Sequence, residues 1–163
     1  MEFPGLLFVI SGPSGVGKGT LCKHLVNCED NLHYSVSMTT RKPRAGEVNG
    51  KDYIFVDRES FLDKASAHEF VEWAEVYDNY YGTPWSELEA ALVKGKDIIL
   101  EIDTQGALQV KQKYPAAISV FILPPCEEEL KARIKGRGSE SPETMEKRLA
   151  NLENELKVIC EYD

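Results

Sequence analysis

Short apolar runs alternate with amphipathic segments along much of the chain. Residues 6–10, 98–102 and 118–123 are almost continuously apolar, a pattern typical of strands buried on both faces of a parallel sheet. Helical patterns follow at 17–26 and, between the last two runs, at 104–114. Strands that alternate with helices predict an α/β fold, with a parallel sheet that has helices on both faces.

A different pattern occupies residues 35–85. This block is rich in aromatic and polar residues, with turn signals at 49–50 and at Gly82. Within it, residues 52–56 alternate like a half-exposed strand, and residues 58–73 read as one helix. We therefore expect a smaller unit inserted outside the main sheet.

A basic, glycine-containing stretch lies at residues 131–149. Ser141 followed by Pro142 predicts the start of a helix within it. An apolar stripe then repeats at spacings of three and four, as expected for a helix face packed on the core: Met145, Leu149, Leu152, Leu156 and Ile159.

The composition is that of an ordinary globular protein. The chain has 163 residues, of which 42% are apolar and 28% charged, which favours a single domain. Its net charge of −8 argues against nucleic acid as the partner. No apolar run approaches the roughly 20 residues that span a bilayer, and the N-terminus lacks the pattern of a secretory signal, so we expect no membrane partner.

The four cysteines show neither a CxxC pair nor a metal-ligand spacing. They are Cys22, Cys28, Cys126 and Cys160. We interpret them as reduced thiols of a cytoplasmic protein.

The segment "ISGPSGVGKGT" matches the phosphate-loop pattern Gly-x-x-x-x-Gly-Lys, with Gly12, Gly17 and Lys18 at the fixed positions. Backbone N–H groups of such a loop, together with the helix that follows, bind phosphate, and the lysine adds a full positive charge. A tight turn without a ligand would not need the lysine. We therefore predict a P-loop NTPase-type sheet with an ATP site at Gly12, Pro13, Ser14, Gly15, Val16, Gly17, Lys18, Gly19 and Thr20.

The residue after the lysine is Gly19, where the usual loop has a Ser or Thr hydroxyl for Mg²⁺. Thr20 could supply that hydroxyl instead. Glu101 and Asp103, at the end of the expected strand 98–102, would face the phosphates across the carboxyl edge of the sheet, although a solvated strand end is the alternative. We expect Mg²⁺ as the cofactor, bound by Thr20 and by Glu101 or Asp103, directly or through water.

Four further blocks resemble the guanylate kinases, in the order and spacing of that family. They are "SVSMTTRKPRAGEVNGKDYIFV" (35–56), "EFVEWAEVYDNYYGTP" (69–84), "ILEIDTQGA" (99–107) and "RIKGRGSES" (133–141). The Lys-Gly-Thr ending of the phosphate loop is also similar to that of bacterial members. The resemblance covers essentially the whole chain. Guanylate kinases usually continue for some tens of residues beyond the position of Asp163, so we expect that a C-terminal segment is lacking.

The resemblance implies an enzyme that transfers the γ-phosphate of ATP to GMP, and also to dGMP, giving ADP and GDP (or dGDP) in purine nucleotide metabolism. It implies a core at about 1–34, 86–132 and 143–163, a GMP-binding subdomain at about 35–85 and a lid at about 133–142.

The resemblance also implies roles for residues of the inserted block. Arg41 and Arg44 would fork onto the phosphate of GMP, and Tyr53 and Tyr81 would add hydroxyl donors. Glu72 would accept from the guanine N1–H and exocyclic amine, where adenine presents the opposite pattern.

Further implied positions lie around the base and in the lid. Ser37 and Thr83 would bond the O6 side of guanine. Asp103 resembles a residue near the guanine amine or ribose, which competes with its metal role, and both remain open. The resemblance implies ATP contacts from Arg133 and Arg137, and catalysis by Lys18, Arg41, Arg137 and Arg148.

Two other classes of function are weaker interpretations. Scaffold domains with this fold bind phosphorylated peptides, but generally have degraded phosphate loops, whereas Gly12, Lys18 and Arg41 are all present here. A kinase for another nucleoside monophosphate is disfavoured by Glu72 together with Ser37 and Thr83. The substrates GMP and ATP are the expected partners, and whether the chain forms a homodimer stays open.

Overall fold

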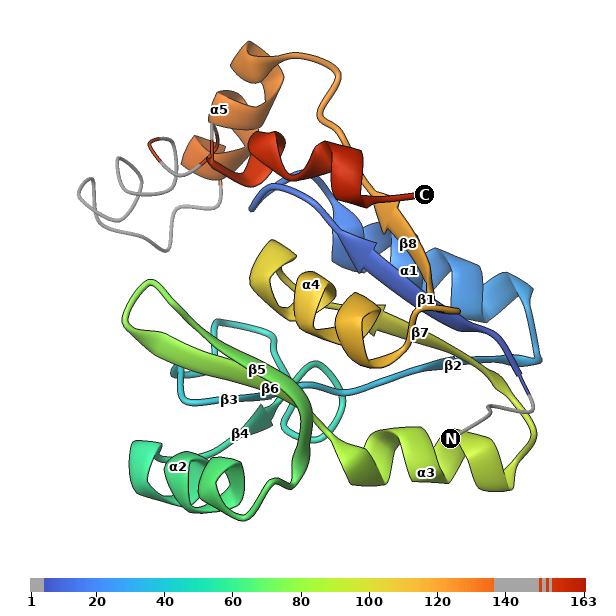
Figure 1. The fold of residues 1–163 in the computed structure, drawn as a ribbon. Coiled ribbons are helices and arrows are strands. Elements are labelled where there is room, and N and C mark those ends of the chain that lie inside the picture. The colour runs from blue at the N-terminus through green and yellow to red at the C-terminus, as the bar shows by residue number, and fades with distance from the viewer. Residues whose placement is uncertain (1–4, 137–149, 151, 153) are drawn as a thin grey trace.

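A four-stranded parallel sheet forms the centre of the fold (Figure 1). The computed structural model describes residues 5–136, 150, 152 and 154–163. The strands of the sheet, in the order β2-β7-β1-β8, are β2 (Leu32–Tyr34), β7 (Asp97–Glu101), β1 (Leu7–Ser11) and β8 (Ile118–Phe121).

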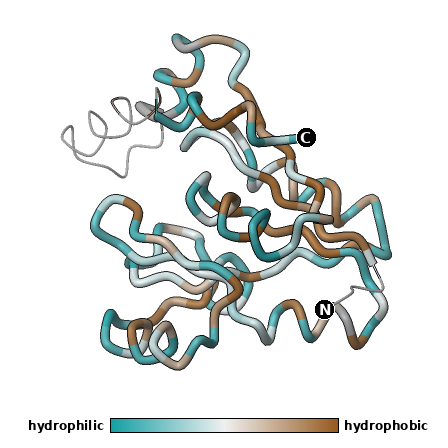
Figure 2. The backbone as a smooth tube through the Cα atoms, viewed as in Figure 1, coloured by the Kyte–Doolittle hydropathy of each residue, from teal (hydrophilic) through white to brown (hydrophobic). Residues whose placement is uncertain are grey.

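Alternate residues of the strands face different layers of helices. Leu7 and Val9 of β1 belong to a core cluster with helices α3 (Trp85–Val93) and α4 (Thr104–Lys113). Ile10 belongs to a second cluster on the opposite face, with helix α1 (Lys18–Cys28). Both faces of the sheet are therefore buried, and the apolar segments of Figure 2 gather along these strands. The predicted α/β fold, with helices on both faces, is confirmed.

A second, smaller sheet lies within the block 35–85. Its strands, in the order β4-β3-β6-β5, are β4 (Ile54–Phe55), β3 (Met38–Thr39), β6 (Asn79–Pro84) and β5 (Phe70–Val76). Helix α2 (Arg58–Ser66) packs on this sheet through Phe61, whose ring stacks on Phe70 and Tyr80 with centroids 4.6 Å and 5.4 Å apart. The smaller sheet thus has an aromatic core of its own.

The predicted helix over 58–73 is wrong in its second half. Helix α2 ends at Ser66, His68 adopts a left-handed φ of 56°, and β5 begins at Phe70. Tertiary contacts explain why the helix stops. The β-favouring residues that follow pair antiparallel with β6, and Val71 is buried in the main core, which stabilises the strand.

Gly82 lies inside β6, so its interpretation as a turn is also wrong. A Cβ at this position would lie 2.8 Å from Cβ of Trp73, which explains the glycine by close packing. The tight turn of the β5–β6 hairpin falls instead at Tyr77 and Asp78, both with positive φ (49° and 64°).

Helix α5 (Glu127–Gly136) and the last residues of the chain lie beside the phosphate-loop side of the sheet (Figure 1). Leu152 and Leu156, from the predicted apolar stripe, pack with Val16 and Leu130. Ile159 begins a short 3₁₀ helix, Ile159–Glu161, and Met145 and Leu149 lie outside the described residues.

The cysteines and the helix lengths can be compared with the composition. The four cysteines Cys22, Cys28, Cys126 and Cys160 are all free thiols. In the part of the chain that the structure describes, no helix has the length and apolarity needed to cross a membrane.

Candidate active site

The phosphate loop connects the end of β1 to the start of α1, as the motif predicts. Gly12, Gly15 and Gly17 all have positive φ, at 138°, 88° and 107°. A Cβ at Gly12 would also lie 2.4 Å from the backbone oxygen of Ile122 on the neighbouring strand segment. The loop therefore takes a path that favours glycine at these positions, and its backbone curls around the N-terminus of α1.

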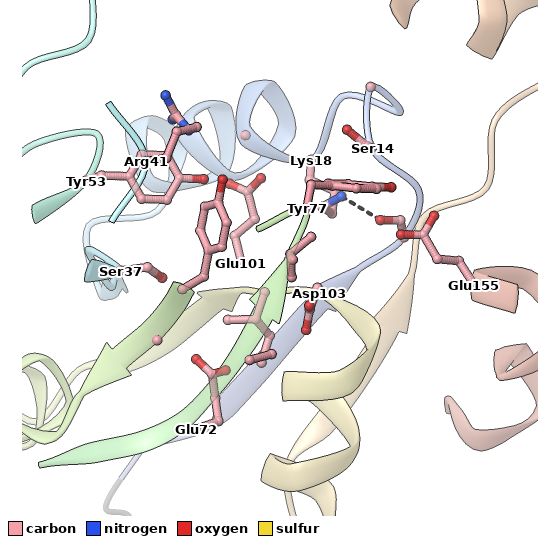
Figure 3. A pocket seen from close by; sticks show the side chains of 18 of the residues that line it. Ser14, Lys18, Ser37, Arg41, Tyr53, Glu72, Tyr77, Glu101, Asp103 and Glu155 are labelled. Atoms are coloured by element: carbon pink, nitrogen blue, oxygen red, sulfur yellow. Dashed lines mark hydrogen bonds between the residues drawn. The ribbon is translucent and has the colours of Figure 1, made fainter. Parts of the chain in front are cut away.

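Lys18 is the first residue of α1, and its side chain turns back over the loop (Figure 3). Its Nζ donates hydrogen bonds to the carbonyl oxygens of Gly12 (2.5 Å) and Pro13 (3.1 Å). The ammonium group is thus held over the concave side of the loop, where a phosphate chain would lie.

The glycine after this lysine lies close to a carboxylate. A Cβ at Gly19 would lie 3.2 Å from Oε2 of Glu101, at the end of β7. The same Oε2 accepts a 2.5 Å hydrogen bond from the hydroxyl of Tyr34. Thr20 is exposed and lines a second hollow together with Glu101. The Lys-Gly-Thr ending thus places Gly19 beside Glu101 and puts the hydroxyl of Thr20 one residue further along the helix.

A single pocket joins the phosphate loop to the smaller sheet (Figure 3). From the predicted site, the residues that line it are Gly12, Ser14, Gly15, Gly17, Lys18, Gly19, Ser37, Arg41, Arg44, Tyr53, Glu72, Tyr81, Glu101 and Asp103. Residues expected to bind ATP and residues expected to bind GMP thus face one space.

The arginine side of this pocket is ordered by Glu47. Nη1 and Nη2 of Arg41 donate to the two carboxylate oxygens of Glu47 at 3.0 Å and 2.9 Å, and the backbone N–H of Arg44 donates to the same carboxylate at 2.7 Å. The guanidinium of Arg41 also lies over the rings of Tyr53 and Phe55, at 5.3 Å and 5.7 Å from their centroids. Burial of the Tyr53 hydroxyl, reinforced by Glu101, raises its pKa to about 12, so it remains a proton donor.

At the other end of the pocket, a carboxyl group is buried. Glu72 is 3% exposed, and its Oε1 accepts a 2.6 Å hydrogen bond from Oγ1 of Thr83. Burial raises the pKa of Glu72 to about 7. Thr83 itself is fully buried and is not among the residues that line the pocket, and its hydroxyl meets Glu72.

Asp103 lies beside Glu72 and caps helix α4. Its Oδ1 accepts from the backbone N–H of Gly106 at 2.7 Å, and burial raises its pKa. Asp103 thus lines the same pocket as Glu72 and Glu101, with Oδ1 engaged in capping the helix.

The remaining predicted residues lie in the phosphate loop and in the lid region. Pro13 and Val16 are buried and support the loop from beneath. Arg133 of α5 donates from Nη1 to the backbone oxygen of Val16 at 3.1 Å, next to the phosphate loop. Arg137 and Arg148 lie outside the described residues.

Sequence reasoning missed Glu47, Tyr77 and Glu155, of which the last two line the pocket. The sequence does indicate a partner for the arginines at Glu47, because an acidic residue three positions after Arg44 can bond to the same loop. Glu155 approaches the pocket only through the packing of the C-terminal residues against α5, and no local pattern indicates it.

A phosphate loop before α1, a parallel sheet and a smaller sheet that carries Arg41 and Arg44 across one pocket define a P-loop nucleotide kinase. The sequence model of the family "Guanylate kinase" matches residues 5–163. The chain belongs to the guanylate kinase family.

Individual relatives are similar over nearly all of the chain. A guanylate kinase of Caldanaerobacter subterraneus subsp. tengcongensis is 53% identical over 98% of this chain and 77% of its own length. One of Clostridioides difficile is 50% identical over 98% of this chain and 78% of its own. The crystal structure of guanylate kinase from Anaplasma phagocytophilum superposes with a TM-score of 0.80 at 37% identity, covering 99% of this chain and 76% of that one.

Proposed function

We propose that the pocket transfers the γ-phosphoryl group of ATP to GMP, or to dGMP, giving ADP and GDP or dGDP. The observation that carries this proposal is that Lys18 and the phosphate loop share one pocket with Arg41, Arg44 and the buried carboxyl of Glu72. Membership of the guanylate kinase family supports the same reaction.

The phosphate loop and the two arginines would hold the reacting phosphates from opposite sides. An oxygen of the GMP phosphate forms the new bond to the γ-phosphorus, while the bond from that phosphorus to the oxygen bridging the β-phosphate breaks, and ADP leaves with that oxygen. Such a transfer needs positioning and charge stabilisation more than a covalent intermediate. Lys18, already aimed over the loop, and Arg41, already ordered by Glu47, supply fixed positive charge.

The base would be recognised at the Glu72 end. An ionised Glu72 accepts from the guanine N1–H and exocyclic amine, and the hydroxyl of Thr83 fixes the carboxylate by donating to Oε1. Ser37 and Asp103 line the same pocket and supply further polar contacts to the nucleotide. Adenine, which lacks the N1–H donor, would leave the carboxylate unpaired, at a cost of about 1–3 kcal/mol.

The residues near the phosphate loop fit Mg²⁺ as a partner of ATP. Thr20 offers a hydroxyl and Glu101 a carboxylate at the same hollow, whereas no cluster of three or more His, Cys, Asp or Glu side chains occurs among the described residues. A bound Mg²⁺ would therefore keep mostly phosphate and water ligands, as it commonly does, and would neutralise charge on the phosphates. Arg133, Arg137 and Arg148 would complete the positive surroundings from the lid.

The reaction belongs to the recycling of GMP, and the free thiols fit a cytoplasmic enzyme. A steady-state assay that couples ADP formation to NADH oxidation, with GMP, dGMP, AMP and UMP in turn, tests the proposal. We expect turnover with GMP and dGMP and at least a hundredfold lower kcat/KM with AMP and UMP. Equal activity on AMP would overturn the assigned base preference, and binding of GMP without turnover would point to a binding domain instead.

A further inference from the structure

Helix α4 presents three residues to the strand that carries Glu72. Gly106, Gln109 and Lys113 are spaced by three and four positions, so they share one face of the helix. Helix α4 lies against β5 in the structure (Figure 1). Because α4 begins just after β7 of the main sheet, this face joins the main sheet to the smaller one.

Gln109 and Lys113 bind the backbone on both sides of Glu72. The side-chain amide of Gln109 pairs with Trp73 much as a neighbouring strand would, since its Nε2 donates to the Trp73 carbonyl at 2.9 Å and its Oε1 accepts from the Trp73 N–H at 3.4 Å. Nζ of Lys113 donates to the carbonyl of Val71 at 2.5 Å. Both peptide groups that flank Glu72 are therefore attached to α4.

Gly106 bounds the carboxyl group itself. A Cβ at this position would lie 2.4 Å from Oε2 of Glu72, a distance that real Cβ atoms essentially never show. The opposing atom is the end of a side chain rather than backbone. An added methyl group would therefore displace the carboxylate from its bond with Thr83 more readily than it would unfold the helix.

We propose that Gly106, Gln109 and Lys113, hereafter the α4 clamp, are positioning residues that set the preference for guanine by holding Glu72 in place. The inference rests on the proposed function, in which Glu72 reads the base. Gln109 and Lys113 fix the backbone of Glu72, and Gly106 leaves the space that its Oε2 occupies. The base-reading carboxylate is thereby attached to the main sheet, not to the smaller sheet alone.

IMP is the probe that isolates this effect, because it keeps the N1–H of GMP and lacks the exocyclic amine. The preference for GMP over IMP, measured as the ratio of kcat/KM values, reports how well both carboxylate oxygens are placed. We expect the ratio to fall about tenfold or more in Gly106→Ala, and severalfold in Gln109→Leu and Lys113→Met. The KM for ATP should stay within about twofold of wild type in all three.

Two controls separate positioning from general damage. Lys113→Arg keeps a cationic donor and should restore the ratio, and Gln112→Ala, an exposed glutamine on the same helix, should leave it unchanged. If Gly106→Ala fails to fold, Gln109→Leu and the pair Lys113→Met and Lys113→Arg carry the test.

Three outcomes would overturn the inference. An unchanged ratio in the clamp variants shows that the clamp does not position Glu72. If kcat/KM falls equally for GMP and IMP while the KM for ATP rises, the clamp residues have a structural role only. If the wild-type protein turns over GMP but does not prefer it to IMP, Glu72 does not read the amine. Absence of wild-type turnover of GMP would instead refute the proposed function, on which this inference rests.

Discussion

Replacement of Glu72 by Gln keeps the shape of the side chain and changes what it offers to a base. In the structure, Oε1 of Glu72 accepts from Thr83 at 2.6 Å, and Oε2 faces Gly106. In Glu72→Gln the amide oxygen can keep the bond with Thr83, which turns the NH₂ group toward the position of Oε2. A donor would then oppose the donor at N1 of guanine.

Loss of a hydrogen bond to a charged group is worth about 1.5–3 kcal/mol, which corresponds to a factor of roughly 10 to 150. We expect kcat/KM for GMP to fall by that factor in Glu72→Gln, with activity on AMP rising relative to GMP. The coupled assay, supported by calorimetric titration with GMP, measures both quantities. An unchanged affinity for GMP would refute the assignment of Glu72 as the group that reads the base.

The same substitution should also change how the free energy of unfolding depends on pH. Burial raises the pKa of Glu72 from 4.5 to about 7, so the folded state holds its proton through a range where the unfolded chain has lost it. The group therefore contributes stability that is fully present below pH 4.5 and is lost as the pH rises through 7, a change on the order of 3 kcal/mol. Glu72→Gln removes this dependence.

The unfolding free energy of Glu72→Gln, relative to wild type, should consequently be higher at pH 8 than at pH 5 in the absence of nucleotide. Urea unfolding at the two pH values measures this difference. Identical pH dependence in the two proteins would show that the carboxyl group of Glu72 is not protonated in the empty site, and the reasoning from its burial would be refuted.

Three further predictions concern the phosphate side of the pocket. Lys18→Met should lower kcat by about a hundredfold or more in the coupled assay, since it removes a charge from the transferred group, and near-native turnover would contradict its role. Glu47→Gln should raise the KM for GMP about tenfold or more, because it weakens the bonds that order Arg41 and the N–H of Arg44, and an unchanged KM would show that the arginines do not need it. Gly12→Ala should reduce the free energy of unfolding by about 1–3 kcal/mol from its φ of 138° alone, measured by urea unfolding, and full stability would show that the loop can relax.

The parts of this fold that the sequence predicts well are those specified by local patterns. The strand, glycine loop and helix around Lys18 are contiguous, and the spacing of Gly12, Gly17 and Lys18 is itself the signal. The central strands could be predicted because continuous apolar runs are typical of a sheet buried on both faces. The residues that face the pocket from the smaller sheet were found through resemblance to a family, since Ser37 and Tyr81 carry no pattern of their own.

What could not be predicted depends on contacts between distant residues. The pattern of residues 58–73 predicts a helix that runs into the first residues of β5, because the charged residues between the apolar positions also suit a helix surface. Pairing with β6 makes this segment a strand. The bonds from Gln109 to Trp73 join residues 36 positions apart. Neither the spacing of the glutamine nor its chemistry indicates such a partner, so the α4 clamp became visible only in three dimensions.

Direct identification of the reaction products tests the central claim, that one pocket both holds ATP and accepts GMP. The purified chain would be incubated with ATP, Mg²⁺ and GMP, and all nucleotides would be quantified by anion-exchange chromatography, with Lys18→Met as the control. We predict that GDP and ADP accumulate in equal amounts at the expense of GMP and ATP, and that the control forms at most about a hundredth as much. Accumulation of ADP without GDP, or equal GDP formation by Lys18→Met, would contradict it.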